Sequence, residues 1–244
     1  MSRVSVADES SNSKTEEQVL VSNITDYSMV PSLYAKKLTS YKSYKSVTSG
    51  STKATVLFIN TEQSIDVTVL KGDYSYMKNE SHSSMVNTVH TAYFNNNNVV
   101  YKNLNEEYTR KSLNDYLDIY GVYPFDSSIE GYIISGSGVT SVEKLESESN
   151  YKFKLTMNPE TSTTNVRIQM REFGGLDDYP RFESIEIVIT IMNDFTPISL
   201  ELKSKYKAKM FMDASCEQSY TVTYSNFNED ITIPDLDIVK PLFQ

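Results

Sequence analysis

Residues 184–202 read SIEIVITIMNDFTPISLEL, and this stretch decides the fold class of the chain. Isoleucine recurs at every second position from 185 to 191, and apolar residues recur in the same way from 198 to 202. A period of two places these side chains on one face of a β-strand. The intervening residues 193–197 include Asn, Asp and Pro, which are typical of turns. The stretch therefore predicts two antiparallel strands, each with one apolar face.

The same alternation of apolar and polar residues recurs on both sides of this pair. Residues 151–157, 166–170 and 220–224 alternate in this way, with turn-like sequence between the segments. Successive strands joined by short turns predict an antiparallel meander. Because each predicted strand is apolar on one side only, one face of the sheet has to be covered.

The N-terminal half carries weaker strand signals. Residues 64–71 alternate clearly, and the run 54–59 is apolar on both faces, which favours a more central position in the sheet. Strands are also expected at 88–94 and 99–101, around an Asn-rich turn at 95–98.

Two helices are predicted from apolar residues at helical spacing. The first covers residues 28–42, and the second covers residues 108–120 with Gly121 at its C-terminal end. A sheet of this size curls instead of staying flat, so both helices can pack in its hollow. We expect an α+β protein that is mostly antiparallel β: one curled sheet, or half-barrel, with helices on its concave face.

The domain organisation follows from composition. Residues 1–25 are rich in Ser, Glu, Asp and Asn and poor in large apolar side chains, so we expect a flexible leader or tether. Residues 26–244 are expected to form a single domain. The formal net charge of −9 argues against a nucleic-acid partner, which would require clustered Lys and Arg. Cys216 is the only cysteine, which excludes an intramolecular disulfide and a multi-cysteine metal site.

The search for catalytic and metal-binding residues is mostly negative. The two histidines, His82 and His90, lie near several serines, but no G-x-S-x-G nucleophile motif occurs, and polar surface histidines are the simpler interpretation. Asp177, Asp178 and the acidic residues between 229 and 237 lack the spacing of a calcium loop and are interpreted as solvated turn residues. We expect no catalytic residue, no metal and no cofactor, and therefore a protein that is not an enzyme.

The remaining candidate is the hollow of the sheet. Its apolar residues form either a dry packed core or the wall of a cavity for an apolar ligand. The inward candidates on the clearest predicted strands are taken as ligand-binding residues: Phe153, Leu155, Ile168, Ile187, Ile189, Leu200 and Leu202.

Several segments together resemble a known family. They read YLDIYG at 116–121, GYII at 131–134, ISLELKSKY at 198–206, YTVTYSNF at 220–227 and ITIPDL at 231–236. This set resembles exported lipoproteins of Gram-positive bacteria that share the LolA-like or LppX-like lipoprotein-carrier fold. The resemblance implies a half-barrel of about eleven strands with helices on its concave side.

The resemblance also implies a function and a location. It implies a cell-surface lipoprotein-type protein that holds a lipid or other apolar ligand in the hollow. It further implies an extracellular protein anchored to the outer face of the cytoplasmic membrane through a lipidated N-terminal cysteine. This chain carries no such cysteine, so we expect the anchor to belong to a leader that precedes it. The alternative is a non-enzymatic module that binds another cell-envelope protein.

Overall fold

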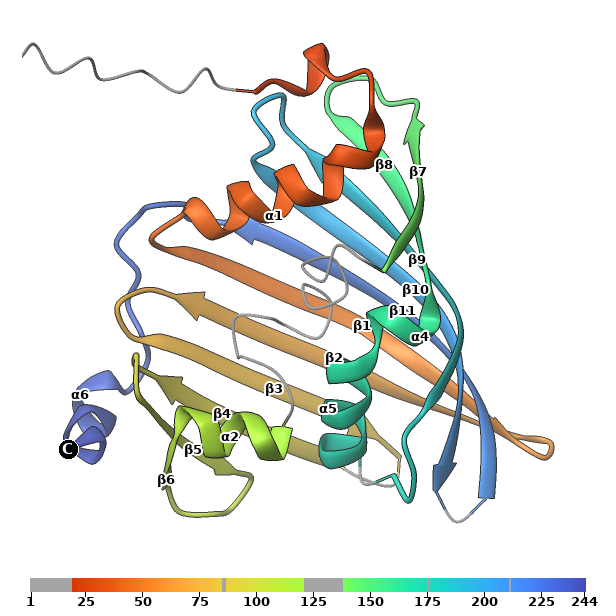
Figure 1. Ribbon diagram of the computed structural model, residues 1–244. Helices are drawn as coiled ribbons and strands as arrows, with labels where there is room; N and C mark the ends of the chain where they lie inside the picture. Colours follow the sequence, from red (N-terminus) through yellow and green to blue (C-terminus); the bar gives the residue numbers. More distant parts are fainter. Residues whose placement is uncertain (1–18, 85–86, 121–137, 175, 211) are drawn as a thin grey trace, which may run out of the picture.

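The protein is described by a computed structural model that covers residues 19–84, 87–120, 138–174, 176–210 and 212–244 (Figure 1). The strands are β1 (Tyr44–Val56), β2 (Ile59–Lys71), β3 (Ser75–Ser83), β4 (Asn87–Phe94), β5 (Asn98–Asn103), β6 (Thr109–Ser112), β7 (Val139–Leu145), β8 (Tyr151–Met157), β9 (Arg181–Ile191), β10 (Pro197–Met210) and β11 (Met212–Ser225). The helices are η1 (Val21–Asn23), η2 (Tyr27–Met29), α1 (Val30–Ser40), α2 (Leu113–Tyr120), α4 (Pro159–Ser162), α5 (Thr164–Gly174), α6 (Leu236–Val239) and η3 (Lys240–Phe243).

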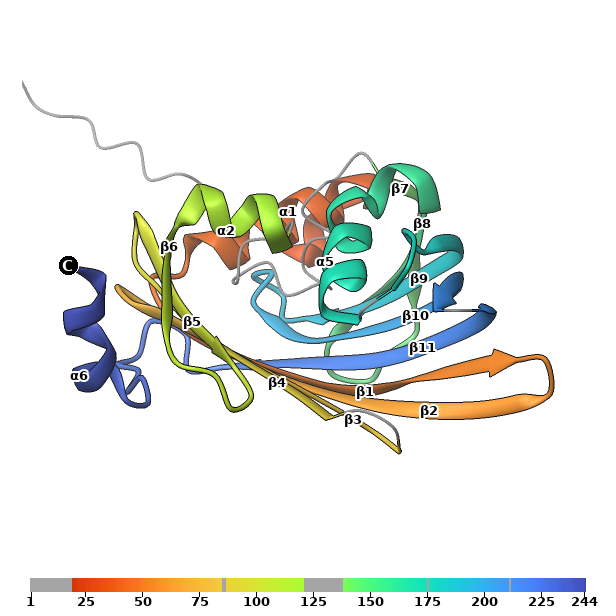
Figure 2. The ribbon, with the colours of Figure 1, turned by 90° about the horizontal axis from the view of Figure 1, so that it is seen from below.

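All eleven strands belong to one sheet in the order β6-β5-β4-β3-β2-β1-β11-β10-β9-β8-β7, and the neighbouring strands are antiparallel. The chain leaves the middle of the sheet through β1 to β6 and returns from the opposite edge through β7 to β11 (Figure 1). The sheet is curled but not closed, and α1, α2 and α5 lie over its concave side (Figure 2). The curled single sheet with helices on its concave face is therefore confirmed.

Helix α1 forms as its sequence predicts. Val30, Tyr34 and Leu38 are spaced four residues apart and are 0–2% exposed, so they form the buried stripe of the helix. Pro31 lies in the first turn, where its missing N–H has no partner to lose. Upstream, Val21 is 3% exposed and donates a backbone hydrogen bond to Asn193. Contact with the sheet therefore begins inside the segment 1–25 that was expected to be a tether.

The strand predicted at residues 166–170 is wrong, because this segment belongs to helix α5. Its apolar residues satisfy the period of a strand and also an i, i+4 spacing, so five residues cannot separate the two structures. Upstream, the Asn158 side chain accepts hydrogen bonds from the backbone N–H groups of Glu160 and Thr161 and caps the short helix α4, which precedes α5. The second predicted helix also starts later than expected, at Leu113, because residues 109–112 pair with β5 as strand β6.

Residues 54–59 were expected to take a more central position in the sheet, and residues 54–56 do belong to β1, the middle strand, but the run is not a single strand. They form the end of β1, a two-residue turn at Leu57 and Phe58, and the start of β2. Strand pairing continues to Val56 and Ile59, so this apolar run is the tip of a long hairpin.

The C-terminal segment covers part of the outer, convex face. Val239 of α6 and Phe243 of η3 pack with Leu70, Tyr76, Tyr93 and Val100, which point away from the hollow. Helix α6 lies apart from α1, α2 and α5 in Figure 2. Strands β3 to β5 are therefore buried on both faces, which explains why their sequences are apolar at consecutive positions.

Candidate functional site

The concave face of the sheet is lined mainly by apolar and uncharged polar side chains. In β11, every second residue from Ala214 to Tyr224 is buried, and the residues between them are exposed. The strand register carries this alternation across the sheet: Tyr224 lies opposite Ser46, and Val222 lies opposite Thr48 and Leu200. No Asp, Glu, Lys or Arg faces inward from the described residues of β1, β3–β5 and β8–β11.

The charged side chains of these strands lie on the outer face. Strand β10 presents Lys at every second position from 203 to 209, and all four are exposed. Lys205 pairs with Glu217 at 2.9 Å, and on the neighbouring strands Lys154 pairs with Glu186 at 2.8 Å. Exposed pairs of this kind add little stability. On the inner face, the register places three lysines at the margins of the apolar clusters, Lys71 opposite Tyr44, Lys111 opposite Val99 and Lys144 opposite Phe153.

Two apolar clusters occupy the concave face. The α1 cluster lies under helix α1 and includes Tyr34, Phe153, Leu155, Ile187, Ile189, Leu200, Leu202 and Val222. The α2 cluster lies under helix α2 and consists of Val67, Val69, Met77, Ala92, Phe94, Val99, Tyr101 and Tyr116. The two clusters meet at β2, where Ile65 packs against both.

A band of uncharged polar side chains lies beside the α1 cluster; we call it the polar band. The Ser204 hydroxyl donates to the amide oxygen of Gln218 at 3.0 Å, and the Gln218 amide nitrogen donates to the Tyr206 hydroxyl at 3.1 Å. On the adjoining strands, the hydroxyls of Thr52 and Tyr220 lie 2.8 Å apart. All five side chains are buried, so these hydrogen bonds replace water on the inner face.

Gly50 makes room for one member of this band. A Cβ atom at residue 50 would lie 2.5 Å from Cδ1 of Tyr220, closer than real Cβ atoms approach other atoms. Glycine in the middle of β1 therefore lets the Tyr220 ring lie flat across the neighbouring strand. Burial raises the pKa of the Tyr220 hydroxyl to about 12, so this hydroxyl stays protonated and able to donate.

Beyond the polar band, towards the β10–β11 hairpin, the inner side chains become short. Ala208, Ala214 and Cys216 are all buried here, and Ala54 lies opposite Cys216 on β1. We call these four residues the small-residue end. Burial raises the pKa of the Cys216 thiol, and a hydrogen bond from Tyr206 opposes the shift.

Helix α1 is joined to the sheet by two polar contacts. The Tyr34 hydroxyl lies 3.0 Å from the Tyr224 hydroxyl, and Lys37 Nζ lies 2.8 Å from Asp194 Oδ2. Burial raises the pKa of the Asp194 carboxyl, but hydrogen bonds from Lys37 and Thr196 outweigh it and lower the pKa overall. The charged pair holds the helix over the α1 cluster at neutral pH.

No protein-family model matches the chain, and no curated protein matches it. Among solved structures, LprF from Mycobacterium bovis matches with a TM-score of 0.43 at 10% identity, covering 85% of this chain and 95% of LprF. A LolA superfamily protein from Nitrosomonas europaea matches with a TM-score of 0.32 at 10% identity, covering 87% of this chain and 97% of that one. A DUF1329 family protein from Desulfovibrio piger also has a TM-score of 0.32 at 10% identity, covering 88% and 98% of the two chains.

These matches have low identities and low TM-scores, so the functional proposal rests on the residues of the concave face.

The structure separates the seven predicted ligand-binding residues into two groups. Six of them belong to the α1 cluster and are 0–1% exposed, where they contact one another beneath α1. Ile168 does not belong with them, because it lies on helix α5 and is half-buried. The polar band was not predicted. Its signal in the sequence was Gly50 in β1, together with hydroxyl and amide residues that alternate with Lys and Glu in β10 and β11.

The two histidines differ in environment. His82 is exposed on β3, but His90 is 3% exposed, which corrects its interpretation as a surface residue. Its Nδ1 lies 2.9 Å from the Asn103 amide oxygen, and its Nε2 lies 2.9 Å from the Tyr116 hydroxyl. Both ring nitrogens thus connect elements of the α2 cluster. Among the described residues, no group of three or more His, Cys, Asp or Glu could hold a metal ion.

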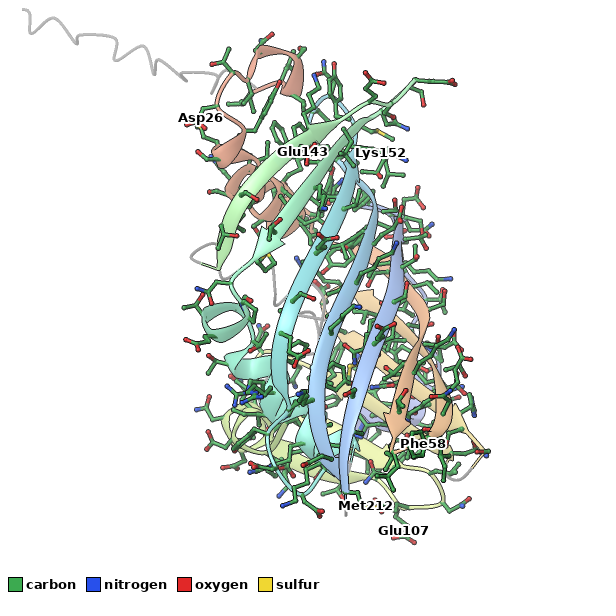
Figure 3. All side chains as sticks on the ribbon, turned by 90° about the vertical axis from the view of Figure 1, so that its right-hand side faces the viewer. Asp26, Phe58, Glu107, Glu143, Lys152 and Met212 are labelled. Carbon is green, nitrogen blue, oxygen red and sulfur yellow. The ribbon has the colours of Figure 1, made fainter. Side chains whose placement is uncertain are left out.

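A surface depression of about 1010 Å³ lies elsewhere, at the β7–β8 hairpin beside Tyr27 and Tyr151. Three glutamates line it, Glu143, Glu146 and Glu148, together with Lys144, whose Nζ lies 5.4 Å from the centre of the Tyr151 ring. It sits at the edge of the sheet, where Figure 3 labels Glu143 and Lys152. This charged, open position makes it a poorer site for an apolar ligand than the concave face.

Proposed function

We propose that this protein binds an apolar ligand of the acyl-chain class on the concave face of its sheet. The observation that carries the proposal is the separation of charge between the two faces. The inner face of β1, β3–β5 and β8–β11 presents apolar and uncharged polar side chains, and Lys and Glu occupy the outer face. Transfer of an acyl chain from water to such a surface is favourable, by about 0.8 kcal/mol per CH₂.

The polar band suits the polar end of such a ligand. Its hydroxyl and amide groups can rearrange their hydrogen bonds towards an ester or a protonated acid without burying a charge. The Ser46 hydroxyl on the same face is fully buried and has no hydrogen-bond partner among the described residues. A ligand oxygen close to β1 would satisfy it.

The ligand has two regions to occupy. The small-residue end has short side chains and lies away from α1. The α1 cluster contains Phe153, Leu155, Ile187, Ile189, Leu200 and Leu202, which a ligand reaches only when α1 separates from the sheet. Ile168 of α5 is proposed to contact a ligand from the helical side. As the movable cover, α1 would separate from the sheet by giving up the burial of Val30, Tyr34 and Leu38 and the Lys37–Asp194 ion pair.

The proposed setting is the exterior of the cell. The family resemblance of the sequence supports an exported protein held at the outer face of the cytoplasmic membrane by a lipid anchor ahead of this chain. No helix among the described residues is long and apolar enough to span a bilayer.

The single cysteine provides a direct test. Cys216 faces the concave side, so a bound acyl chain should slow its reaction with a thiol reagent severalfold. The matched control is the double variant Cys216→Ser/Ser215→Cys, which moves the thiol by one residue to the exposed face of the same strand. A long-chain fatty acid is expected to slow the reaction of the parent protein and to leave the control unchanged.

Extraction of the purified protein with organic solvent, followed by mass spectrometry, provides an independent measurement. A stoichiometric acyl-containing species is expected. Equal thiol reactivity with and without saturating fatty acid, together with an empty extract, would reject the proposal in favour of a module that binds a cell-envelope protein.

A further inference from the structure

The tip of the β1–β2 hairpin exposes three large apolar side chains in a row. Leu57 is 76% exposed, Phe58 is 98% exposed and Ile59 is 67% exposed. Strand β11 adds Met212, which is 52% exposed and lies at the same end of the molecule as Phe58 (Figure 3). We call these four residues the apolar tip. A cluster of this kind on a soluble domain indicates contact with another apolar phase.

The backbone of the apolar tip is strained in a way that a polar turn would avoid. Leu57 has a φ of 54°, in the left-handed region where glycine and asparagine are favoured. A two-residue hairpin loop is normally built from such residues. The chain instead places leucine and phenylalanine there, so the side chains at this turn serve something other than the stability of the turn.

The apolar residues form a short cap on a polar hairpin. Directly behind the turn, the Thr55 hydroxyl donates to the Asn60 amide oxygen at 2.8 Å across the two strands. Only the Val56–Ile59 pair, roughly 3.4 Å of strand, and the two turn residues lie beyond it. With the side chains of the turn added, this cap is of the same order as the 5–10 Å to which interfacial protein segments enter the boundary between headgroups and acyl chains.

The shape of the tip favours a membrane over a protein partner. The hairpin projects past β3, because β2 pairs with β3 only from Gln63 onward, whereas β1 and β2 remain paired out to Val56 and Ile59 (Figures 1 and 2). On the other side, β11 pairs with β1 as far as Thr55 and brings Met212 to the same end. A stable protein interface buries about 800 Å² on each partner, much more than four side chains at a projecting point can supply. A bilayer surrounds a projecting tip on all sides and needs no complementary shape.

We propose that the apolar tip inserts into the interfacial region of a phospholipid bilayer and docks the protein on a membrane surface by this end. The net charge of −9 gives no general attraction to anionic lipid, so binding depends on apolar burial and persists at high salt. The small-residue end lies on the same end of β10 and β11 as Met212, so docking would bring the proposed ligand site close to lipid.

The chain has no tryptophan, which allows a direct measurement. In the variant Phe58→Trp, the introduced indole is the only one, and its fluorescence should shift to shorter wavelength when phosphatidylcholine vesicles are added. Vesicles with brominated acyl chains should quench it. The matched control is Ile238→Trp, at a position that is 67% exposed like Ile59 but lies on α6, and its emission should not change.

A second variant separates insertion from folding. Leu57→Gly/Phe58→Ser removes the two turn side chains and relieves the left-handed strain, so its free energy of unfolding should be equal to or above that of the parent. Its partitioning into phosphatidylcholine vesicles should fall by more than about tenfold, since burial of either side chain alone is worth that factor. Parent partitioning should change little between low and high salt.

Two results would overturn the proposal. The first is emission of Phe58→Trp that does not respond to saturating lipid. The second is an emission shift that follows protein concentration without lipid, which would assign the tip to contact between copies of this chain. Ligand binding is measured at Cys216, and membrane insertion is measured at residue 58. Either proposal can therefore fail while the other holds.

Discussion

The hydroxyls of Tyr34 on α1 and Tyr224 on β11 lie 3.0 Å apart, and both side chains are buried, although 190 residues separate them in the sequence. This contact joins the first long helix to the last strand above the α1 cluster. It depends on the pairing of β1 with β11, which brings the beginning and the end of the sheet-forming chain together in the middle of the sheet.

Removal of one hydroxyl measures this connection. Tyr34→Phe keeps the ring and removes the hydrogen bond, so the free energy of unfolding should fall by about 1 kcal/mol. Urea unfolding followed by circular dichroism measures the change. Tyr179→Phe is the control, because that side chain is 40% exposed and should give almost no loss. Equal losses in the two variants would show that the Tyr34 hydroxyl does not stabilise the fold.

The sequence was sufficient for the C-terminal strands and insufficient for helix α5. The alternation runs from Ile185 to Ile191 in β9, from Ile198 to Ala208 in β10 and from Ala214 to Tyr224 in β11, and only a strand satisfies that pattern. Residues 166–170 carry only three apolar positions, which fit a helix equally well. The neighbours that pack against this segment, and not its own pattern, decide its structure.

Two further features concern exposure. The apolar run 54–59 was expected to take a more central position in the sheet, but pairing continues to the end of the hairpin and places Leu57 and Phe58 in an exposed turn. The two-sided burial of β3 to β5 had a signal, since Tyr93 and Phe94 are apolar at adjacent positions and therefore face opposite sides. The outer face of these strands is covered by the C-terminal segment. This is a long-range contact, which local sequence does not encode.

The C-terminal cover can be tested with neighbouring residues. Phe243 is 7% exposed, and its ring centre lies 5.4 Å from that of Tyr74, whereas Leu242 is 41% exposed. Phe243→Ala should lower the free energy of unfolding by about 3 kcal/mol and increase the binding of a dye that reports exposed apolar surface. Leu242→Ala should cost less than about 0.5 kcal/mol. Similar effects of the two substitutions would mean that α6 and η3 do not cover the outer face in solution.

The buried His90 gives the fold a pH dependence of predictable sign. Burial lowers the pKa of His90 below its ordinary value of 6.5, and hydrogen bonding to Asn103 and the charge of Glu106 only partly oppose this shift. Between the folded and unfolded pKa values, the unfolded chain therefore binds more protons than the folded chain. Stability contributed by His90 is fully present above pH 6.5 and is lost as the pH falls below it.

We expect the free energy of unfolding to fall between pH 6.5 and pH 5, and His90→Gln to flatten that slope, because glutamine retains hydrogen-bonding capacity without titrating. The carboxyls of Asp26, Asp194 and Glu217 do not interfere, since their pKa values are lowered from ordinary values of 3.8–4.5 and they titrate below this window. Urea unfolding at several pH values gives the slope, and His82→Gln, at the exposed histidine, should leave it unchanged. If His90→Gln keeps the slope of the parent, the loss of stability in this window arises from groups outside the α2 cluster, and His90 is not buried as a neutral ring.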